Sequence, residues 1–408
     1  MVVVAATEPA EGTRERLSTF VGEVVAGMAH VRQRANALVY VRGLLEHGGR
    51  KSLQPTLFRL GESTARYESL QQFVADSPWD SQALVRALAE RVVPAIDAQA
   101  WVIDDTGFPK DGRRSPGVKR QYSGTLGKVG NCQIGVSLHA VGFSGTLPLG
   151  WALYLPDEWC ADPARRRAAK IPAQVRFATK PELALEMIGV AAAWAIEPAP
   201  ILGDQAYGDN TGLRSGLDEA GRQYVLSVSP ALGVFGPGTV FAIPERRPGR
   251  GRPPSVARPD RPPQSVAALA ATLEPGAFSE IAFTTGPRGR RRSGRFAFVR
   301  VAAAHPIVDD HREPRTEWLI VEWPEGAQRP SDYWLANLPA DTAPDRLAQL
   351  ARLRWVIELD YRQLKGELGL DHYEGRSYAG WHHHCALVTA AHAFLTEERL
   401  CPPARRPA

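Results

Sequence analysis

Acidic residues in three distant parts of the sequence are candidate metal ligands. Asp104 and Asp105 end the apolar run AWVIDD, and the turn-forming residues TGFPKDG follow at once. Asp204 ends a second apolar run, PAPILGD, and Glu358 lies in a segment whose apolar residues have helical spacing. Carboxylate oxygens are the ligands that Mg²⁺ prefers, and two such ions about 4 Å apart activate the attacking oxygen and stabilise the leaving oxygen when a phosphodiester is cut. These residues therefore predict metal-assisted phosphodiester chemistry.

The adjacent aspartates cannot both face one site. Successive side chains of a strand point to opposite faces, so Trp101, Ile103 and Asp105 share one face. Val102 and Asp104 share the other face. One aspartate is expected to bind metal and the other to orient a neighbouring group, and a one-residue shift at the strand end would exchange these roles.

The segment around Glu358 has the pattern of a helix that packs on a sheet. Its apolar stripe consists of Leu350, Leu353, Ile357, Tyr361, Leu364 and Leu368. Arg354, Glu358 and Lys365 follow the border of this stripe, so we expect one continuous helix whose edge faces the metal site. Arg354, Lys365 and the neighbouring Arg362 are candidates for contacts with DNA phosphates. The alternative for this border is an ordinary solvated helix face.

The elements expected between residues 98 and 229 bring the acidic residues together. Three strand-like runs, AWVIDD, CQIGVSLHAVGF and LGWALYLP, precede a helix at 179–196, the strand that ends at Asp204, a helix near 210–221 and the strand RQYVLSVSP. This order predicts an α/β fold of the ribonuclease H-like kind, with a mixed sheet flanked by helices. The carboxyl ends of its first and fourth strands would then lie side by side, with Asp105 and Asp204 at a position where α/β sheets bind ligands. Tyr207 and Asp104 are possible supporting residues.

Four regions are expected along the chain. Residues 1–97 form a helical N-terminal region, either a DNA-end-binding module or a simple helical cap, and 98–229 form the first part of the catalytic core. Residues 230–342 are expected to be a β-rich insertion with an Arg/Pro-rich loop rather than a continuation of the sheet. Residues 343–408 form the C-terminal helical part that carries Glu358.

The composition of the chain is typical of a folded protein and includes many arginines. The chain has 408 residues, 44% of them hydrophobic, and a formal net charge of +5. Seven of its 49 basic residues are lysines, which leaves 42 arginines, and guanidinium groups suit phosphate recognition. No window approaches the ~20 apolar residues of a membrane span, and the N-terminus lacks the pattern of a signal peptide, so a cytoplasmic protein is expected. The four scattered cysteines suggest neither a disulfide framework nor a zinc site.

Other basic segments are weighed as DNA contacts. Lys119, Arg120 and Lys128 lie in the loop between the first two expected strands, where DNA contact and a solvated loop are both open. The stretch RPGRGRPP resembles segments that lie in narrow minor grooves, although a plain arginine-rich loop explains it as well. Consecutive histidines at 382–384 point in different directions on a helix and do not suit one zinc ion.

Long motifs in the chain resemble the DDE transposases of bacterial insertion sequences. They are IDDTGFPKDGRRSPGVKRQYSGTLGKVGNCQIGVSLHA, LPDEWCADPARRR, FATKPELALEMI, GDQAYGDN and RWVIELDYRQLKGELGLDHYEGRSYAGWHHH. They are most similar to the insertion-sequence 701 family, a relative of the larger insertion-sequence 4 group, and the resemblance covers nearly the whole chain. It implies a cut-and-paste transposase that cleaves the ends of its element and joins the 3′-hydroxyls to target DNA.

The resemblance also implies residue roles. The Asp-Thr pattern selects Asp105, and the other two acidic positions fall on Asp204 and Glu358, with two Mg²⁺ ions for which Mn²⁺ would substitute. The larger group's signature Y-x2-R-x3-E-x6-K matches Arg354, Glu358 and Lys365, but Ala351 replaces its tyrosine. The expected partners are double-stranded DNA and a second copy of the chain. The alternatives are a nuclease of the same fold without strand transfer, and a non-catalytic DNA-binding descendant.

Overall fold

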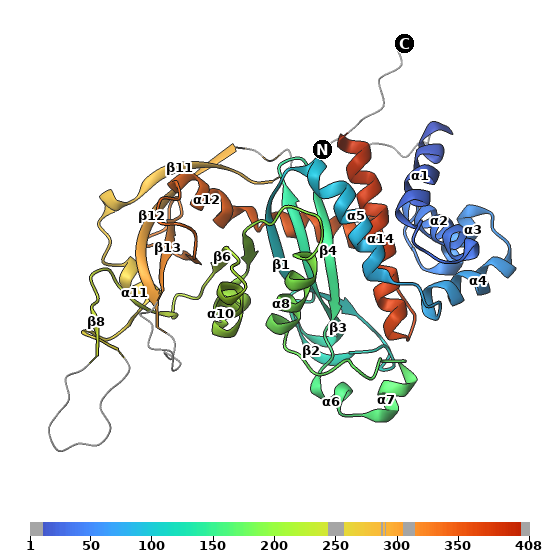
Figure 1. Cartoon of the computed structure of the whole chain (residues 1–408), viewed down its shortest axis with the longest axis horizontal. Coiled ribbons are helices and arrows are strands. Elements are labelled where there is room, and N and C mark those ends of the chain that lie inside the picture. Colours follow the sequence, from blue (N-terminus) through green and yellow to red (C-terminus); the bar gives the residue numbers. More distant parts are fainter. Residues whose placement is uncertain (1–10, 244–256, 287–288, 290, 305–314, 401–408) are drawn as a thin grey trace, which may run out of the picture. The chain divides into compact units, whose positions relative to one another are not determined.

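The computed structural model describes residues 11–243, 257–286, 289, 291–304 and 315–400. Contacts divide the chain into two compact units. Unit 1 consists of Met1–Pro198 and Val356–Ala408, and unit 2 consists of Ala199–Trp355. Both units contain sheets flanked by helices, so the predicted α/β class is confirmed (Figure 1). The stretch RPGRGRPP lies outside the described residues.

The N-terminal part of unit 1 is helical, as predicted. Its helices are α1 (Glu11–Val24), α2 (Val31–Leu45), α3 (Leu53–Leu60), α4 (Thr64–Ala75) and α5 (Ser81–Ile96). They gather around α14 (Tyr378–Leu400), which lies beside α5 in Figure 1. Most of α14 is buried because helices pack against it on one side and the sheet on another. No helix of the described residues is both long enough and apolar enough to cross a membrane.

The sheet of unit 1 is antiparallel and is centred on its longest strand, β3. It contains β1 (Ala98–Pro109), β2 (Lys119–Ser123), β3 (Lys128–Gly142) and β4 (Thr146–Leu153). β1 pairs along one edge of β3, and β2 and β4 pair with different parts of the other edge. The predicted meander of β1, β3 and β4 is confirmed, whereas the short, polar β2 was missed.

Different helices cover the two faces of this sheet. On one face, α8 (Lys180–Ala191) packs so closely that a Cβ atom on Gly150 would lie 3.2 Å from the sulfur of Met187. On the other face are α13 (Val356–Gly366) and α14, where the Trp151 indole donates a hydrogen bond to Thr389. The short helices α6 (Asp157–Cys160) and α7 (Pro163–Ala168) follow β4.

Unit 2 contains a mixed sheet. β5 (Ile201–Gly203) and β6 (Tyr224–Ser227) are parallel, and β14 (Asp332–Ala336), β13 (Thr316–Trp323) and β12 (Arg291–Ala303) continue the sheet antiparallel to β6 and to one another. β11 (Ser279–Thr284) and β7 (Gly233–Phe235) pair with β12, β10 (Gln264–Ser265) pairs with β7, and β8 (Phe241–Ala242) pairs with β9 (Arg258–Pro259). The helices are α9 (Gln205–Gly208), α10 (Thr211–Glu219), α11 (Val266–Ala270), the 3₁₀ turn η1 (Pro275–Ala277) and α12 (Pro344–Leu353).

The sheet of unit 2 corrects one prediction. The strands of residues 230–342 were expected to stand apart from the sheet, but β14 pairs directly with β6. Their inward side chains, which include Leu319, Val321 and Leu335, form one core with Val228, just past the end of β6. The strands of this region are therefore part of the sheet that begins with β5 and β6.

The single helix predicted across the apolar stripe is also wrong. α12 ends at Leu353 and α13 begins at Val356. α12 packs on β11 and β6 within unit 2, whereas α13 packs on β1 within unit 1. The stripe is interrupted because its two halves bury their apolar residues in different units.

Candidate active site

The two adjacent aspartates face opposite sides of the unit 1 sheet. In the antiparallel pairing, Asp104 lies opposite Ser137 and Asp105 lies opposite Val136. Opposed residues of paired strands point to the same face. The Ser137 hydroxyl is 2.6 Å from the Tyr361 hydroxyl of α13. Asp104 therefore points to the face that α13 covers, and its residue is only 8% exposed.

Asp105 points to the face covered by α8. Its Oδ2 atom accepts a hydrogen bond from the Lys180 ammonium at 2.8 Å, and this ion pair is partly exposed. Lys180 is held in place because it is the first residue of α8, where Thr179 and Glu182 form a capping box. The backbone N–H of Asp105 donates a hydrogen bond to Asp104 Oδ1 at 2.7 Å. Asp104 thus supports the strand end, and Asp105 is held by a lysine.

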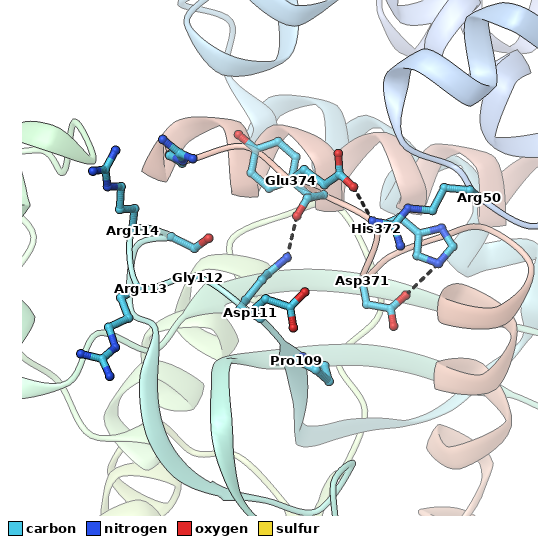
Figure 2. Close-up of a pocket in the computed structure, with 13 residues that line it drawn as sticks. Arg50, Pro109, Asp111, Gly112, Arg113, Arg114, Asp371, His372 and Glu374 are labelled. Carbon is cyan, nitrogen blue, oxygen red and sulfur yellow. Dashed lines mark hydrogen bonds and ion pairs between the residues drawn. The ribbon is translucent and has the colours of Figure 1, made fainter.

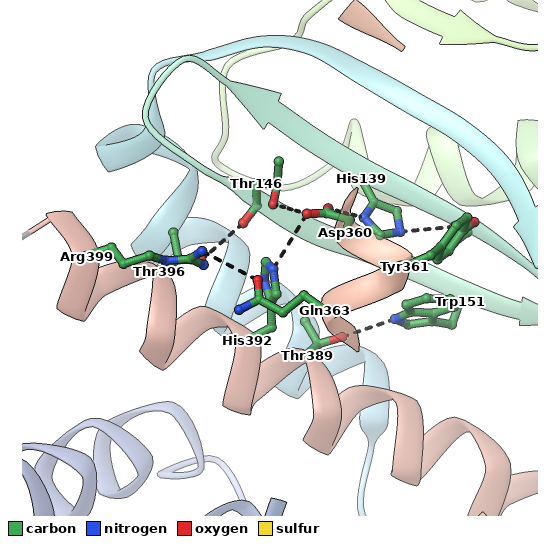
Figure 3. Close-up of polar contacts among 11 residues, drawn as sticks. His139, Thr146, Trp151, Asp360, Tyr361, Gln363, Thr389, His392, Thr396 and Arg399 are labelled. Atoms are coloured by element: carbon green, nitrogen blue, oxygen red, sulfur yellow. Dashed lines mark hydrogen bonds and ion pairs between the residues drawn. The ribbon is translucent and has the colours of Figure 1, made fainter. Parts of the chain in front are cut away.

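A buried polar network fixes α13 to the sheet (Figure 3). Asp360 accepts hydrogen bonds from the Thr146 hydroxyl at 2.5 Å and from His139 Nδ1 at 2.9 Å. Burial alone would raise the pKa of Asp360, but the hydrogen bond from His139, nearby His392 and the hydroxyl of Thr146 bring that pKa below its usual value. A charged, fully bonded carboxylate in this position resists sliding or rotation of the helix.

Glu358 lies two residues before Asp360, and its side chain is exposed. Residues seven apart share one side of a helix, so Glu358 and Lys365 lie on the same side of α13. The Lys365 ammonium donates hydrogen bonds to the Gly107 carbonyl at 2.7 Å and to the Thr125 hydroxyl at 3.2 Å. This side of α13 therefore faces β1, and the Asp104 face of β1 and Glu358 belong to the same side of the sheet.

Lys365 is partly buried, and its ammonium group is bound to the protein. Its ammonium lies 5.5 Å from the centre of the Phe108 ring, and burial lowers the pKa of Lys365 to about 8. It joins the end of α13 to the strand just past the aspartates. Its contact with a DNA phosphate stays a prediction.

Asp204 lies in unit 2, directly after β5. Its Oδ1 atom caps α9 by accepting hydrogen bonds from the backbone N–H groups of Ala206 at 2.9 Å and Tyr207 at 3.3 Å. The side chain remains partly exposed, whereas Tyr207 is buried. The sequence placed this aspartate correctly at the end of a strand.

The other predicted DNA contacts are distributed over several elements. Lys119 of β2 pairs with Glu158 at 3.1 Å. Arg120 of β2, Lys128 of β3 and Arg362 of α13 are exposed, and Arg354 lies in the break between α12 and α13. Asp104 and Asp105 thus lie on β1, and Glu358 and Lys365 lie on α13, which packs on β1. Among the described residues, no three His, Cys, Asp or Glu side chains are grouped closely enough to hold a metal ion.

Sequence reasoning missed Lys180 and the network around Asp360. Lys180 lies in a helix-capping pattern, TKPE, which marks the start of α8 but does not reveal the partner of the lysine. Asp360 occupies the buried side of α13, and an acidic residue at such a position is a signal for a buried partner. Its partner His139 is 221 residues away, so only the folded chain identifies the pair.

Comparisons with known proteins identify similar sequences. A protein-family model described as "DDE superfamily endonuclease" matches residues 23–290, well over half of the chain. A curated protein of Microchaete diplosiphon, named "Probable transposase for insertion sequence element IS701", is 29% identical over 164 residues. The match includes 40% of this chain and 40% of that protein, so the chain spans less than half the length of this relative.

Proposed function

Since the chain belongs to the family of DDE superfamily endonucleases, we propose that it is a cut-and-paste DNA transposase. It binds the ends of an insertion sequence, hydrolyses phosphodiester bonds there and joins the freed 3′-hydroxyls to target DNA. The similarity to a protein named a probable transposase supports this choice within the family. Its substrates are double-stranded DNA ends and target DNA in the bacterial cytoplasm, and pairing of two ends requires a homodimer.

The observation that carries the proposal is the position of Asp104 on the α13 side of β1. The Asp104 residue is 8% exposed and lies on the face of β1 that α13 covers. Glu358, on the side of α13 that faces β1, supplies a second, exposed carboxylate. We therefore assign the strand ligand to Asp104, in place of the Asp105 predicted from the sequence, because Asp105 faces α8 and pairs with Lys180.

We keep Asp204 as the third proposed carboxylate, as the sequence predicts, since it directly follows β5. We propose a ribonuclease H-like core for unit 1 and the beginning of unit 2, because its element order is the one expected for that fold. We also propose that the chain consists of the four predicted regions, with boundaries at residues 97, 229 and 342, and that each region has the role expected from the sequence.

The proposed ligands suit Mg²⁺. Carboxylate oxygens alone, without Cys or His, favour a hard cation over zinc. When bound, two Mg²⁺ ions would supply charge stabilisation for the attacking and leaving oxygens of the phosphodiester. The contribution of the chain is to hold Glu358 at a fixed position through the anchoring of α13 and to hold the strand end through Asp104.

The test is a product assay on a duplex that carries the element's own end, labelled at both strands, with Mg²⁺ and a target plasmid. Cleavage followed by covalent joining of the labelled 3′ end to the plasmid is the expected result. Cleavage without joining would identify a nuclease of the same fold. Binding without cleavage in Mg²⁺ or Mn²⁺ would identify a DNA-binding descendant.

A further inference from the structure

A groove opens at the carboxyl end of β1, directly after the strand that carries the aspartates (Figure 2). It has a volume of about 570 Å³ and lies within unit 1. The loop of residues 109–115 forms one wall, and the segment 371–376 that follows α13 forms another. The groove is thus built from the residues next to β1 and α13, the two elements of the proposed active site.

The groove carries more positive than negative side chains. Its cationic residues are Arg50, Lys110, Arg113, Arg114 and Arg376, and its acidic residues are Asp111, Asp371 and Glu374. Glu374 pairs with Arg50, and Lys110 donates a hydrogen bond to the Tyr373 carbonyl. Within the part of the chain that the structure describes, Arg113, Arg114 and Arg376 have no hydrogen bond or ion pair, and all three are exposed. These guanidinium groups can bind an anion without breaking an existing interaction.

The loop that carries Arg113 and Arg114 is firmly held at both sides. The Asn131 side chain donates a hydrogen bond to the Gly112 carbonyl at 3.0 Å, and the Gln133 side chain donates one to the Pro116 carbonyl at 2.7 Å. Gly117 has a φ of +78°, and a Cβ atom there would lie 2.6 Å from the Tyr154 carbonyl oxygen. A loop fixed in this way presents its two arginines with little loss of backbone entropy on binding.

The positive surface continues beyond this groove. A second groove of about 470 Å³ shares Asp111 and Arg113 with the first and extends to Arg120 of β2. The guanidinium group of Arg120 also makes no hydrogen bond or ion pair to the rest of the described chain. The arginines therefore form a track rather than a closed pocket, which suits a polymer of phosphates better than a single small anion.

The groove begins close to the proposed active site. Pro109, which lines it, is the last residue of β1 and follows Asp104 by five positions on that strand.

We propose that Arg113, Arg114 and Arg376 bind backbone phosphates of the DNA beside the phosphodiester that is cut. This inference rests on the proposed function and names the surface that holds the substrate beside the active site. Guanidinium contacts to phosphate position the duplex and do not depend on its sequence. The groove therefore contributes equally to the binding of element ends and of unrelated DNA.

The test compares Arg113→Ala/Arg114→Ala with a matched control, Arg86→Ala/Arg176→Ala, in the full chain. The control removes the same charge from two exposed arginines of unit 1 outside the groove. Duplex affinity is measured by fluorescence anisotropy between about 50 and 200 mM salt, with an element end and with an unrelated duplex. The groove variant should bind both duplexes at least tenfold more weakly at about 0.1 M salt, and the slope of log affinity against log salt should decrease by about 2, one unit for each lost contact. The control should match the wild type.

Two further variants separate loss of contact from loss of fold. Arg113→Lys/Arg114→Lys keeps both charges and should recover most of the affinity, and Arg376→Ala should lower the slope by about 1. An unchanged slope and affinity for the groove variant would overturn the inference. If the wild type binds duplexes through the groove but cuts none, the proposed function is refuted and the groove remains a DNA-binding surface. If the wild type binds no duplex, both the proposed function and this inference are overturned.

Discussion

Asp104 and Asp105 are chemically identical neighbours with different surroundings. Asp104 is buried on the α13 side of β1, and Asp105 is held on the α8 side by Lys180. Strand alternation places the two carboxylates on opposite faces of the sheet. In our proposal Asp104 has the metal-binding role, because Asp105 already pairs with Lys180.

The Asp105–Lys180 pair is expected to contribute little to stability. Its side chains are 21% and 34% exposed, so solvent screens the attraction. In a double-mutant cycle with Asp105→Asn and Lys180→Met, urea unfolding should give a coupling free energy below about 1 kcal/mol, and each variant should still cut DNA. A coupling of several kcal/mol would show that the pair is a structural anchor rather than a screened surface contact.

At the level of elements, α13 owes its position to the network around Asp360. The helix carries Glu358, and its contacts with Thr146, His139 and Ser137 involve β3 and β4 rather than β1 alone. Fixing one helix to two strands in this way sets both its rotation and its height over the sheet.

Removing the Asp360 carboxylate should loosen α13. In Asp360→Ala, the Thr146 hydroxyl and His139 would be left buried without an acceptor, so we expect a loss of about 3 kcal/mol in the free energy of unfolding by urea. DNA cleavage, measured at a temperature where the variant remains folded, should also decrease because Glu358 is no longer held. The matched control is Glu367→Ala, an exposed carboxylate directly after α13, which should stay within about 0.5 kcal/mol of wild type. Equal stability of the two variants would contradict the anchoring role.

Local patterns predicted several elements well and their assembly less well. The apolar runs before Asp104 and Asp204 predicted β1 and β5, and the spacing after residue 179 predicted α8. The stripe from Leu350 to Leu368 did not reveal the break at Arg354, because periodicity cannot tell that its two halves bury in different units. In the same way, alternation along β1 gives two faces, but only the packing of α8 and α13 decides which aspartate meets which helix.

At the scale of the whole molecule, buried histidines of α14 tie the N-terminal helices to the rest of unit 1. The Tyr40 hydroxyl of α2 donates a hydrogen bond to His384 Nδ1 at 2.8 Å, and His384 Nε2 donates to the Gly369 carbonyl at 3.1 Å. This arrangement requires a neutral ring. Burial lowers the pKa of His384 to about 4, and it lowers the pKa of His382 to about 4 as well.

These pKa values predict a loss of stability in mild acid. An unfolded histidine takes up a proton below its ordinary pKa of about 6.5, whereas folded His382 and His384 stay neutral down to about pH 4. The stability that depends on the neutral rings is therefore complete above pH 6.5 and decreases as the pH falls toward 4, by about 1 kcal/mol per histidine for each pH unit below 6. Thermal unfolding at pH 7.5, 6.5 and 5.5 measures this loss. His384→Gln should make the dependence shallower, and a Tm that stays constant over this range would contradict the prediction.

The most direct test of the account is cleavage of the element's own end in Mg²⁺ by the wild type and by Asp104→Ala, Asp105→Ala, Asp204→Ala and Glu358→Ala, each checked for folding and DNA binding. We expect the Asp104, Asp204 and Glu358 variants to bind DNA but to cut it about 10³-fold more slowly or worse, since each removes a proposed metal ligand. The Asp105 variant should keep its cleavage within about tenfold of the wild type. If Asp105→Ala is inactive while Asp104→Ala cuts normally, the metal ligand faces α8 and our assignment is wrong. If all four variants cut as the wild type does, these carboxylates are not the active site.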